Sequence, residues 1–277
     1  SDTQLRDLFR EYKGKVRTVG LTSISTTLKQ VARVARISKE ILPDVPIIVG
    51  GCHARLLPED IIRYPEVDVV FTSEAELATL DYAKGKKLSQ IEGVMYRENG
   101  RIINNPVTSV IKNLDDIPFP DYSLFNIADY HTVKGVAKRH PNSYIITSRG
   151  CPYDCTYCSS KALNPTGKKT VRFRSPENTV AEIEMLVKKY GVRELFISDE
   201  LFTINKKHLF GICEGILKLN LDVIWVCMTH VNHIDQEKLK IIKKAGCHQV
   251  CYGIESGDPK IQREIGKNLD LQRVKEI

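Results

Sequence analysis

The stretch Tyr144-Ile-Ile-Thr-Ser-Arg-Gly-Cys151-Pro-Tyr-Asp-Cys155-Thr-Tyr-Cys158 joins a short apolar run to three closely spaced cysteines. The apolar run predicts a β-strand, so the cysteine loop is expected at the carboxyl end of that strand. Thiolates are the ligands of iron–sulfur clusters, and four of them saturate a [4Fe-4S] cube. Cys151, Cys155 and Cys158 supply three thiolates, which would leave one iron open to a small molecule.

Zinc is the main alternative for this loop, because a distant histidine such as His140 or His248 would complete a four-ligand site. Structural zinc sites usually pair two cysteine knuckles, and the sequence contains no second Cys-x-x-Cys. An inert group of thiols is the remaining alternative. The spacing therefore favours a cluster and leaves zinc open.

The other five cysteines are expected to be buried single thiols, because each lies among apolar residues. They are Cys52, Cys213, Cys227, Cys247 and Cys251. Eight cysteines distributed in this way argue against a disulfide framework. A reducing, cytoplasmic location is therefore expected.

The composition is that of an ordinary globular protein of 277 residues, with 42% apolar and 27% charged residues. The net charge of +7 is spread out, and pairs such as Lys206-Lys207 and Lys243-Lys244 lie on predicted solvated helix faces. This pattern predicts no nucleic-acid partner. Because no apolar run reaches about 18 residues, no membrane span is expected either.

A repeated strand–helix order begins at Ser143 and continues toward the last residue. Strands are expected at 144–147, 194–198, 223–228 and 249–253. Helices are expected from the cap Ser175-Pro176 to Gly191, over 205–217 and over 235–246. Such units predict a parallel barrel or partial barrel over 143–277, with its site at the carboxyl ends of the strands.

The first half of the chain also alternates between strand and helix. Strands are expected at 16–22, 45–49 and 67–71, and their continuous apolarity is typical of parallel strands covered on both faces. Helices are expected over 28–42 and 74–83, and Asn99-Gly100 predicts a hairpin. These elements predict a doubly wound, Rossmann-like α/β domain over 1–105, followed by a proline-stiffened linker over 106–142.

The motif Cys151-x-x-x-Cys155-x-Tyr157-Cys158 resembles the signature of the radical S-adenosylmethionine (SAM) superfamily, and the resemblance covers about 143–277. It implies a [4Fe-4S] cluster on the three cysteines, with SAM chelating the open iron. Reductive cleavage of SAM then gives a 5′-deoxyadenosyl radical that abstracts hydrogen. The resemblance also implies further SAM contacts, from Tyr157, from Ser198, Asp199 and Glu200, and from Gly253, Glu255 and Ser256.

The whole chain resembles the subclass that places a cobalamin-binding domain before the radical SAM barrel. Segments such as Pro58-Glu59 and Ile117-Pro-Phe-Pro-Asp121 carry this likeness. The residues that it implies for cobalamin are Ser23, Ser25, Thr26, Gly50, Gly51 and His53. The sequence departs from the subclass in three places. It has no Asp-x-His-x-x-Gly motif, Ser73-Glu-Ala-Glu76 lacks the usual glycines, and Met228-Thr-His230 stands where an arginine is often expected.

The function implied is cobalamin-dependent methylation or rearrangement of an unactivated carbon in a small-molecule or lipid-like substrate. An electron donor such as flavodoxin or ferredoxin is the implied protein partner. Two alternatives remain: a radical SAM enzyme whose first domain holds no cobalamin, and a zinc-stabilised binding module without catalysis. The sequence identifies no catalytic residue beyond the cofactor ligands. The chain is also expected to be a fragment, truncated at both ends, and incompletely active on its own.

Overall fold

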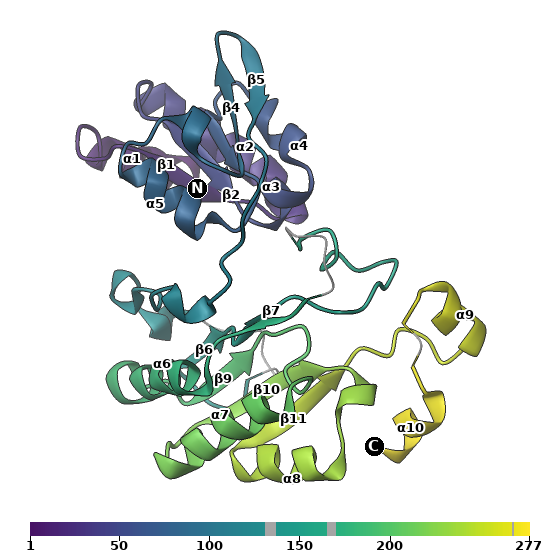
Figure 1. The fold of residues 1–277 in the computed structure, drawn as a ribbon. Helices are drawn as coiled ribbons and strands as arrows, with labels where there is room; N and C mark the ends of the chain where they lie inside the picture. Colours follow the sequence, from purple (N-terminus) through teal and green to yellow (C-terminus); the bar gives the residue numbers. More distant parts are fainter. Residues whose placement is uncertain (131–136, 165–169, 268) are drawn as a thin grey trace. The chain divides into compact units, whose positions relative to one another are not determined.

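The computed structural model describes residues 1–130, 137–164, 170–267 and 269–277. The chain forms two compact units (Figure 1). The first contains Ser1–Val110 and a short segment that begins at Ala162. The second contains Ile111–Lys161 and the rest of the chain to Ile277. The change of unit after Val110 falls inside the stretch 106–142 that was expected to be a linker.

The first unit is built on a five-stranded sheet in which the strands lie in chain order. The strands are β1 (Val19–Thr22), β2 (Ile47–Gly50), β3 (Val69–Phe71), β4 (Val94–Glu98) and β5 (Arg101–Asn104). The first three are parallel, and β4 and β5 form an antiparallel hairpin. Asn99 and Gly100 both have positive φ angles, 50° and 76°, as a two-residue hairpin turn requires.

Helices cover both faces of this sheet, as the apolar strands predicted. One face packs against α2 (Leu28–Ile41), α3 (Cys52–Leu56) and α4 (Pro58–Ile62), and the other against α5 (Ala75–Ala83). The strand order does not reverse between β1 and β3, so right-handed crossovers place α2, α3 and α4 on the same face. The sequence did not predict α1 (Asp2–Glu11), which packs on α2 through Phe9.

The second unit is built on an open parallel sheet in the order β11-β10-β9-β6. These strands are β6 (Asn142–Ile145), β9 (Glu194–Ile197), β10 (Ile224–Thr229) and β11 (Cys247–Tyr252). The helices between them are α6 (Pro176–Tyr190), α7 (Lys206–Lys218) and α8 (Gln236–Lys244), and α9 (Pro259–Glu264) and α10 (Leu271–Glu276) follow. The four predicted strands and three predicted helices are therefore confirmed.

Short elements complete the second unit. A two-stranded antiparallel pair, β7 (Ser148–Arg149) and β8 (Arg172–Phe173), lies beyond the end of β6. Single turns of 3-10 helix occur at Leu114–Asp116, Tyr122–Leu124, Ile127–Asp129 and, as η6, at Val231–His233. In the described part of the chain, no helix is both long and apolar enough to cross a membrane.

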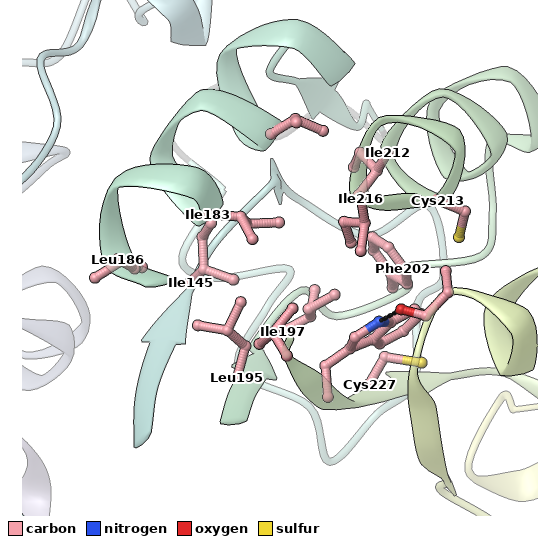
Figure 2. Packing of buried hydrophobic residues seen from close by; sticks show 14 of the residues in the cluster. Ile145, Ile183, Leu186, Leu195, Ile197, Phe202, Ile212, Cys213, Ile216 and Cys227 are labelled. Carbon is pink, nitrogen blue, oxygen red and sulfur yellow. Dashed lines mark hydrogen bonds between the residues drawn. The ribbon is translucent and has the colours of Figure 1, made fainter. Parts of the chain in front are cut away.

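The core of the second unit lies between the parallel sheet and its helices. Figure 2 shows Ile183 and Ile212, from α6 and α7, pointing toward Ile197 of the sheet. Trp225 of β10 is fully buried, and its indole N–H donates to the carbonyl oxygen of Ala245 at 2.8 Å. The opposite face of the sheet carries Tyr144, which is 58% exposed. One face of the sheet therefore forms the core, and apolar side chains on the other remain accessible.

Candidate functional site

The cysteine loop begins directly after β7. Gly150 has a φ of 103°, and a Cβ at this position would clash with the carbonyl oxygen of Thr170, so a glycine is required at the entry to the loop. Cys151 and Cys155 are partly buried, Cys158 is exposed, and all three are free thiols. The loop thus presents three accessible thiols at the carboxyl end of the sheet.

The three thiols lie close enough to influence one another. Burial raises the pKa of the Cys151 thiol, and the nearby charges of Glu200, Cys158 and Cys155 raise it further. Three free thiols of one loop, with no disulfide among them, fit the donor set of a cluster with one open iron. Among the residues with described positions, no three His, Cys, Asp or Glu side chains converge on a single metal ion.

The two histidines considered for a zinc site, His140 and His248, lie at the opposite end of the parallel sheet from the cysteine loop. His248 is the second residue of β11, and its Nε2 lies 2.8 Å from Glu194 Oε1 at the start of β9. His140 precedes β6 and contacts Asn142 at 3.0 Å. Both therefore lie at the amino ends of parallel strands, whereas the cysteine loop follows the carboxyl end of β6.

Asp199 and Glu200 were both expected to bind SAM, and the structure gives them different surroundings. Asp199 is fully buried and accepts hydrogen bonds from Thr147 N at 2.6 Å, Thr147 Oγ1 at 2.6 Å and Ser148 Oγ at 2.5 Å. Glu200 is exposed, and its charge acts on Cys151. Asp199 therefore fixes the chain that leads into the cysteine loop, and Glu200 is the carboxylate presented beside it. Ser198 is half-buried.

Tyr157 and Glu255, two further residues expected at the SAM site, are joined by a lysine that the sequence did not single out. Lys267 Nζ donates to Tyr157 OH at 3.0 Å and to Glu255 Oε1 at 2.9 Å. The hydrogen bond from Lys267 lowers the pKa of Glu255. A Cβ on Gly253 would lie 2.7 Å from Lys267 Nζ, so a side chain there would displace the lysine ammonium. Ser256 Oγ accepts from Asp258 N at 3.1 Å, beside this group.

A second aromatic group, also missed by the sequence analysis, holds the middle of the cysteine loop. The rings of Tyr153 and His230 stack at 4.5 Å with an interplanar angle of 7°. Tyr153 OH also lies 2.8 Å from His233 Nε2. Burial lowers the pKa of both histidines, which favours neutral imidazoles. His230, the last residue of the segment found in place of an expected arginine, thus packs against the cysteine loop.

The residues expected to bind cobalamin lie at the ends of β1 and β2 in the first unit: Ser23, Ser25, Thr26, Gly50, Gly51 and His53. His53 is buried, and its Nδ1 lies 3.0 Å from Ser25 Oγ. Ser23 Oγ and His53 Nε2 are buried without a hydrogen-bond partner in the described structure, although Asp60 Oδ2 is 3.6 Å from that Nε2. Unpartnered buried polar atoms fit a polar ligand at this edge.

Gly51 is required by the geometry of this edge. Its φ is 97°, and a Cβ there would lie 2.6 Å from the carbonyl oxygen of Ser23.

The prediction that the five single cysteines are buried is wrong for Cys52. Cys52 is exposed rather than buried, because it begins α3 and faces outward, whereas Ala54 of the same short helix faces the core. Cys213 and Cys227 are buried as predicted, and Cys247 and Cys251 are partly buried.

Two family models match separate parts of the chain. The Radical SAM superfamily model matches residues 145–277, and the B12 binding domain model matches residues 3–82. The predicted order, a Rossmann-like cobalamin-type domain before a radical SAM domain, is confirmed. The cofactor set implied by these domains is also the predicted one, namely a [4Fe-4S] cluster, SAM and cobalamin.

Two curated relatives align with most of the chain. An uncharacterized methyltransferase of Pyrococcus horikoshii is 36% identical over 92% of this chain and 55% of its own length. An anaerobic magnesium-protoporphyrin IX monomethyl ester cyclase of Rubrivivax gelatinosus is 30% identical over 92% of this chain and 46% of its own length. The chain thus spans about half the length of these relatives.

A solved structure shares the fold. The radical SAM methyltransferase TsrM of Kitasatospora setae, determined with cobalamin and a [4Fe-4S] cluster bound, superimposes with a TM-score of 0.74. The match covers 97% of this chain and 55% of that one, at 16% sequence identity. At this identity the likeness is one of fold.

Proposed function

Because this chain belongs to the radical SAM superfamily and carries a B12 binding domain, we propose that it serves cobalamin-dependent methylation or rearrangement of an unactivated carbon. The observation that carries the proposal is the group of side chains at the carboxyl end of the parallel sheet. Three free thiols lie there on one loop, with exposed Glu200 acting on Cys151. A cluster with one open iron needs such a set of ligands.

When bound, the cluster, SAM and cobalamin supply reductive SAM cleavage and a transferable methyl group. The chain's own residues hold and orient them. Cys151, Cys155 and Cys158 provide thiolates, and Glu200 provides an accessible carboxylate for the SAM amino group. Glu255, held in place by its hydrogen bond from Lys267, provides an acceptor for hydroxyl groups of SAM. Asp199 holds the approach to the loop in place.

The first unit is proposed to hold the corrin at the ends of β1 and β2. Ser23 Oγ and His53 Nε2 are buried and without hydrogen-bond partners in the described structure, so they are available to polar groups of a ligand. Gly50 and Gly51 carry no side chain, so a ligand can approach the backbone closely there. The hydrogen bond between Ser25 Oγ and His53 Nδ1 fixes the orientation of the His53 ring toward such a ligand.

The substrate is proposed to be a small or lipid-like organic molecule. The sheet face away from the helices exposes Tyr144, stacked on Phe196 at 5.1 Å, together with Met228, which is 47% exposed. Apolar and aromatic side chains of this kind bind organic ligands. Reductive chemistry requires an electron, so a flavodoxin or ferredoxin is proposed as partner, and the free thiols are consistent with a reducing cytoplasm.

Anaerobic purification followed by cluster reconstitution tests the proposal. The expected product is a brown chain with about four iron and four sulfide per molecule, by the stoichiometry of the cube. The C155A variant should lose that iron, whereas C52A, which removes an exposed cysteine of the other unit, should keep it.

The outcomes separate the alternatives. A colourless chain with one zinc would reject cluster-dependent activity in favour of a zinc-stabilised binding module. A chain that holds the cluster but no corrinoid would favour an enzyme without cobalamin. Mass analysis of products formed with SAM and cobalamin then distinguishes methyl transfer from other radical chemistry.

A further inference from the structure

The chain after α9 folds back onto the cysteine loop. Thr156 N donates to the carbonyl oxygen of Ile265 at 3.0 Å, which joins the two backbones between the second and third cysteines. Gly266, with a φ of 68°, lies against Asp154, because a Cβ there would be 3.3 Å from the Asp154 carbonyl oxygen. We call residues 265–267 the clasp.

Lys267, the last residue of the clasp, is almost enclosed, with a side chain that is only 10% exposed. Its ammonium lies 2.9 Å from Glu255 Oε1, 3.0 Å from Tyr157 OH and 5.8 Å from the centre of the Tyr157 ring. Burying a lysine is unfavourable unless its charge is paired, and Glu255 supplies the pairing carboxylate. Lys267 therefore links the residue before Cys158 to the turn after β11.

The turn that carries Glu255 is tied to the same clasp from its other side. Glu255 has a φ of 65°, a left-handed conformation that few side chains adopt without support. Gln262 of α9 is buried, and its Nε2 donates to the carbonyl oxygens of Ile254 at 2.5 Å and Ser256 at 2.6 Å. Hydrogen bonds thus connect the turn, α9 and the clasp to one another, and the clasp in turn contacts the cysteine loop.

From these contacts we propose that Lys267 is a positioning residue that couples the SAM-binding glutamate to the cysteine loop. The inference rests on the proposed function of this site. Lys267 fixes the position of the Glu255 carboxylate by a hydrogen bond. Through its hydrogen bond to Tyr157 OH, it also fixes the distance between that carboxylate and the cysteine loop. A SAM molecule that contacts Glu255 would thereby have a fixed position relative to the three cysteines.

The test replaces Lys267 by methionine, which keeps an unbranched side chain and removes the charge and the donors. In the reconstituted chain, K267M is expected to keep its iron and sulfide and to bind SAM about tenfold more weakly. The SAM-induced change in the electron paramagnetic resonance spectrum of the reduced cluster should shrink accordingly. K260M is the matched control. The side chain of Lys260 on α9 is 78% exposed, and its ion pair with Glu264 is long, at 3.9 Å.

A second comparison shows whether Lys267 acts through Glu255. Because the lysine positions the carboxylate, K267M combined with E255Q should bind SAM no more weakly than E255Q alone, and K267R should recover part of the affinity. A K267M affinity within twofold of the parent chain would overturn the proposal. So would loss of iron and of cooperative unfolding in K267M and K267R together, since Lys267 would then be a structural residue. A parent chain that binds neither iron nor SAM would instead contradict the proposed function.

Discussion

His208 lies on α7 at the centre of a buried polar chain behind the cysteine loop. Thr147 Oγ1 donates to Asp199 Oδ2 at 2.6 Å, so it accepts from His208 Nε2, which is 2.9 Å away. The ring also packs against Phe173 and Phe202. Burial lowers the pKa of His208 to about 4. A neutral imidazole is therefore part of the folded second unit.

This burial predicts a loss of stability in mild acid. An unfolded histidine takes up a proton near pH 6.5, whereas folded His208 resists it down to about pH 4. The stabilisation is fully present above pH 6.5 and is lost as the pH falls toward 4, by about 3 kcal/mol in all. Urea unfolding at a series of pH values should show this slope in the parent chain. H208Q should reduce this slope, whereas H140Q, at an exposed histidine of the same unit, should leave it unchanged.

The two acids that follow β9 show where residue-level prediction reaches its limit. Asp199 and Glu200 are both polar, adjacent and at the end of a predicted strand, so the sequence assigns them one role. Their roles divide because Asp199 points at donors from Thr147 and Ser148, which are 52 and 51 positions away in the chain. Which of two neighbouring carboxylates is enclosed depends on tertiary contacts that periodicity does not encode.

At the scale of elements, α6 and α7 pack closely because small residues lie between them. A Cβ on Gly215 of α7 would lie 2.5 Å from a methyl carbon of Val180 on α6, and one on Gly211 would lie 2.8 Å from Pro176. Glycine lowers helix stability relative to alanine, so its presence twice within α7 has a packing reason.

Gly215→Ala is therefore expected to destabilise the second unit, against the propensity of alanine for helices. The added methyl must displace the buried Val180 side chain, which costs about 1–3 kcal/mol, whereas propensity alone would stabilise by roughly 1 kcal/mol. Chemical denaturation measures the difference. Gly257→Ala is the control, because no atom lies within 4 Å of the Cβ that it would add. A stabilised G215A would show that the two helices separate without cost.

Elements were predicted best where local pattern and tertiary packing agree. The helix between Ser175 and Gly191 is confirmed as Pro176–Tyr190, with a serine cap and a left-handed glycine at its ends. Buried parallel strands were located to within a few residues, because their apolar runs are continuous. The clasp was not predicted, because Lys267 looks like any surface lysine until its partners Tyr157 and Glu255 are brought beside it by the fold.

At the scale of the whole molecule, each unit has a candidate site at the carboxyl ends of its parallel strands. Parallel strands carry their ligand sites at their carboxyl ends. In the first unit the ends of β1 and β2 present Ser23 and Gly51, and in the second unit the chain beyond β6 leads into the cysteine loop. Each unit has its own hydrophobic core, so a change at one edge need not disturb the folding of the other core.

The two cofactors should therefore be lost separately when one edge is altered. Gly51→Ala adds a Cβ within 2.6 Å of the Ser23 carbonyl oxygen at a φ of 97°, which must shift the edge proposed to hold cobalamin. This variant should retain several-fold less corrinoid after reconstitution, with its iron content unchanged. C155A should do the reverse, losing the cluster and keeping the corrinoid. Visible absorbance and metal analysis of iron and cobalt on the same samples measure both. Equal loss of iron and cobalt in either variant would contradict the assignment of one cofactor to each edge.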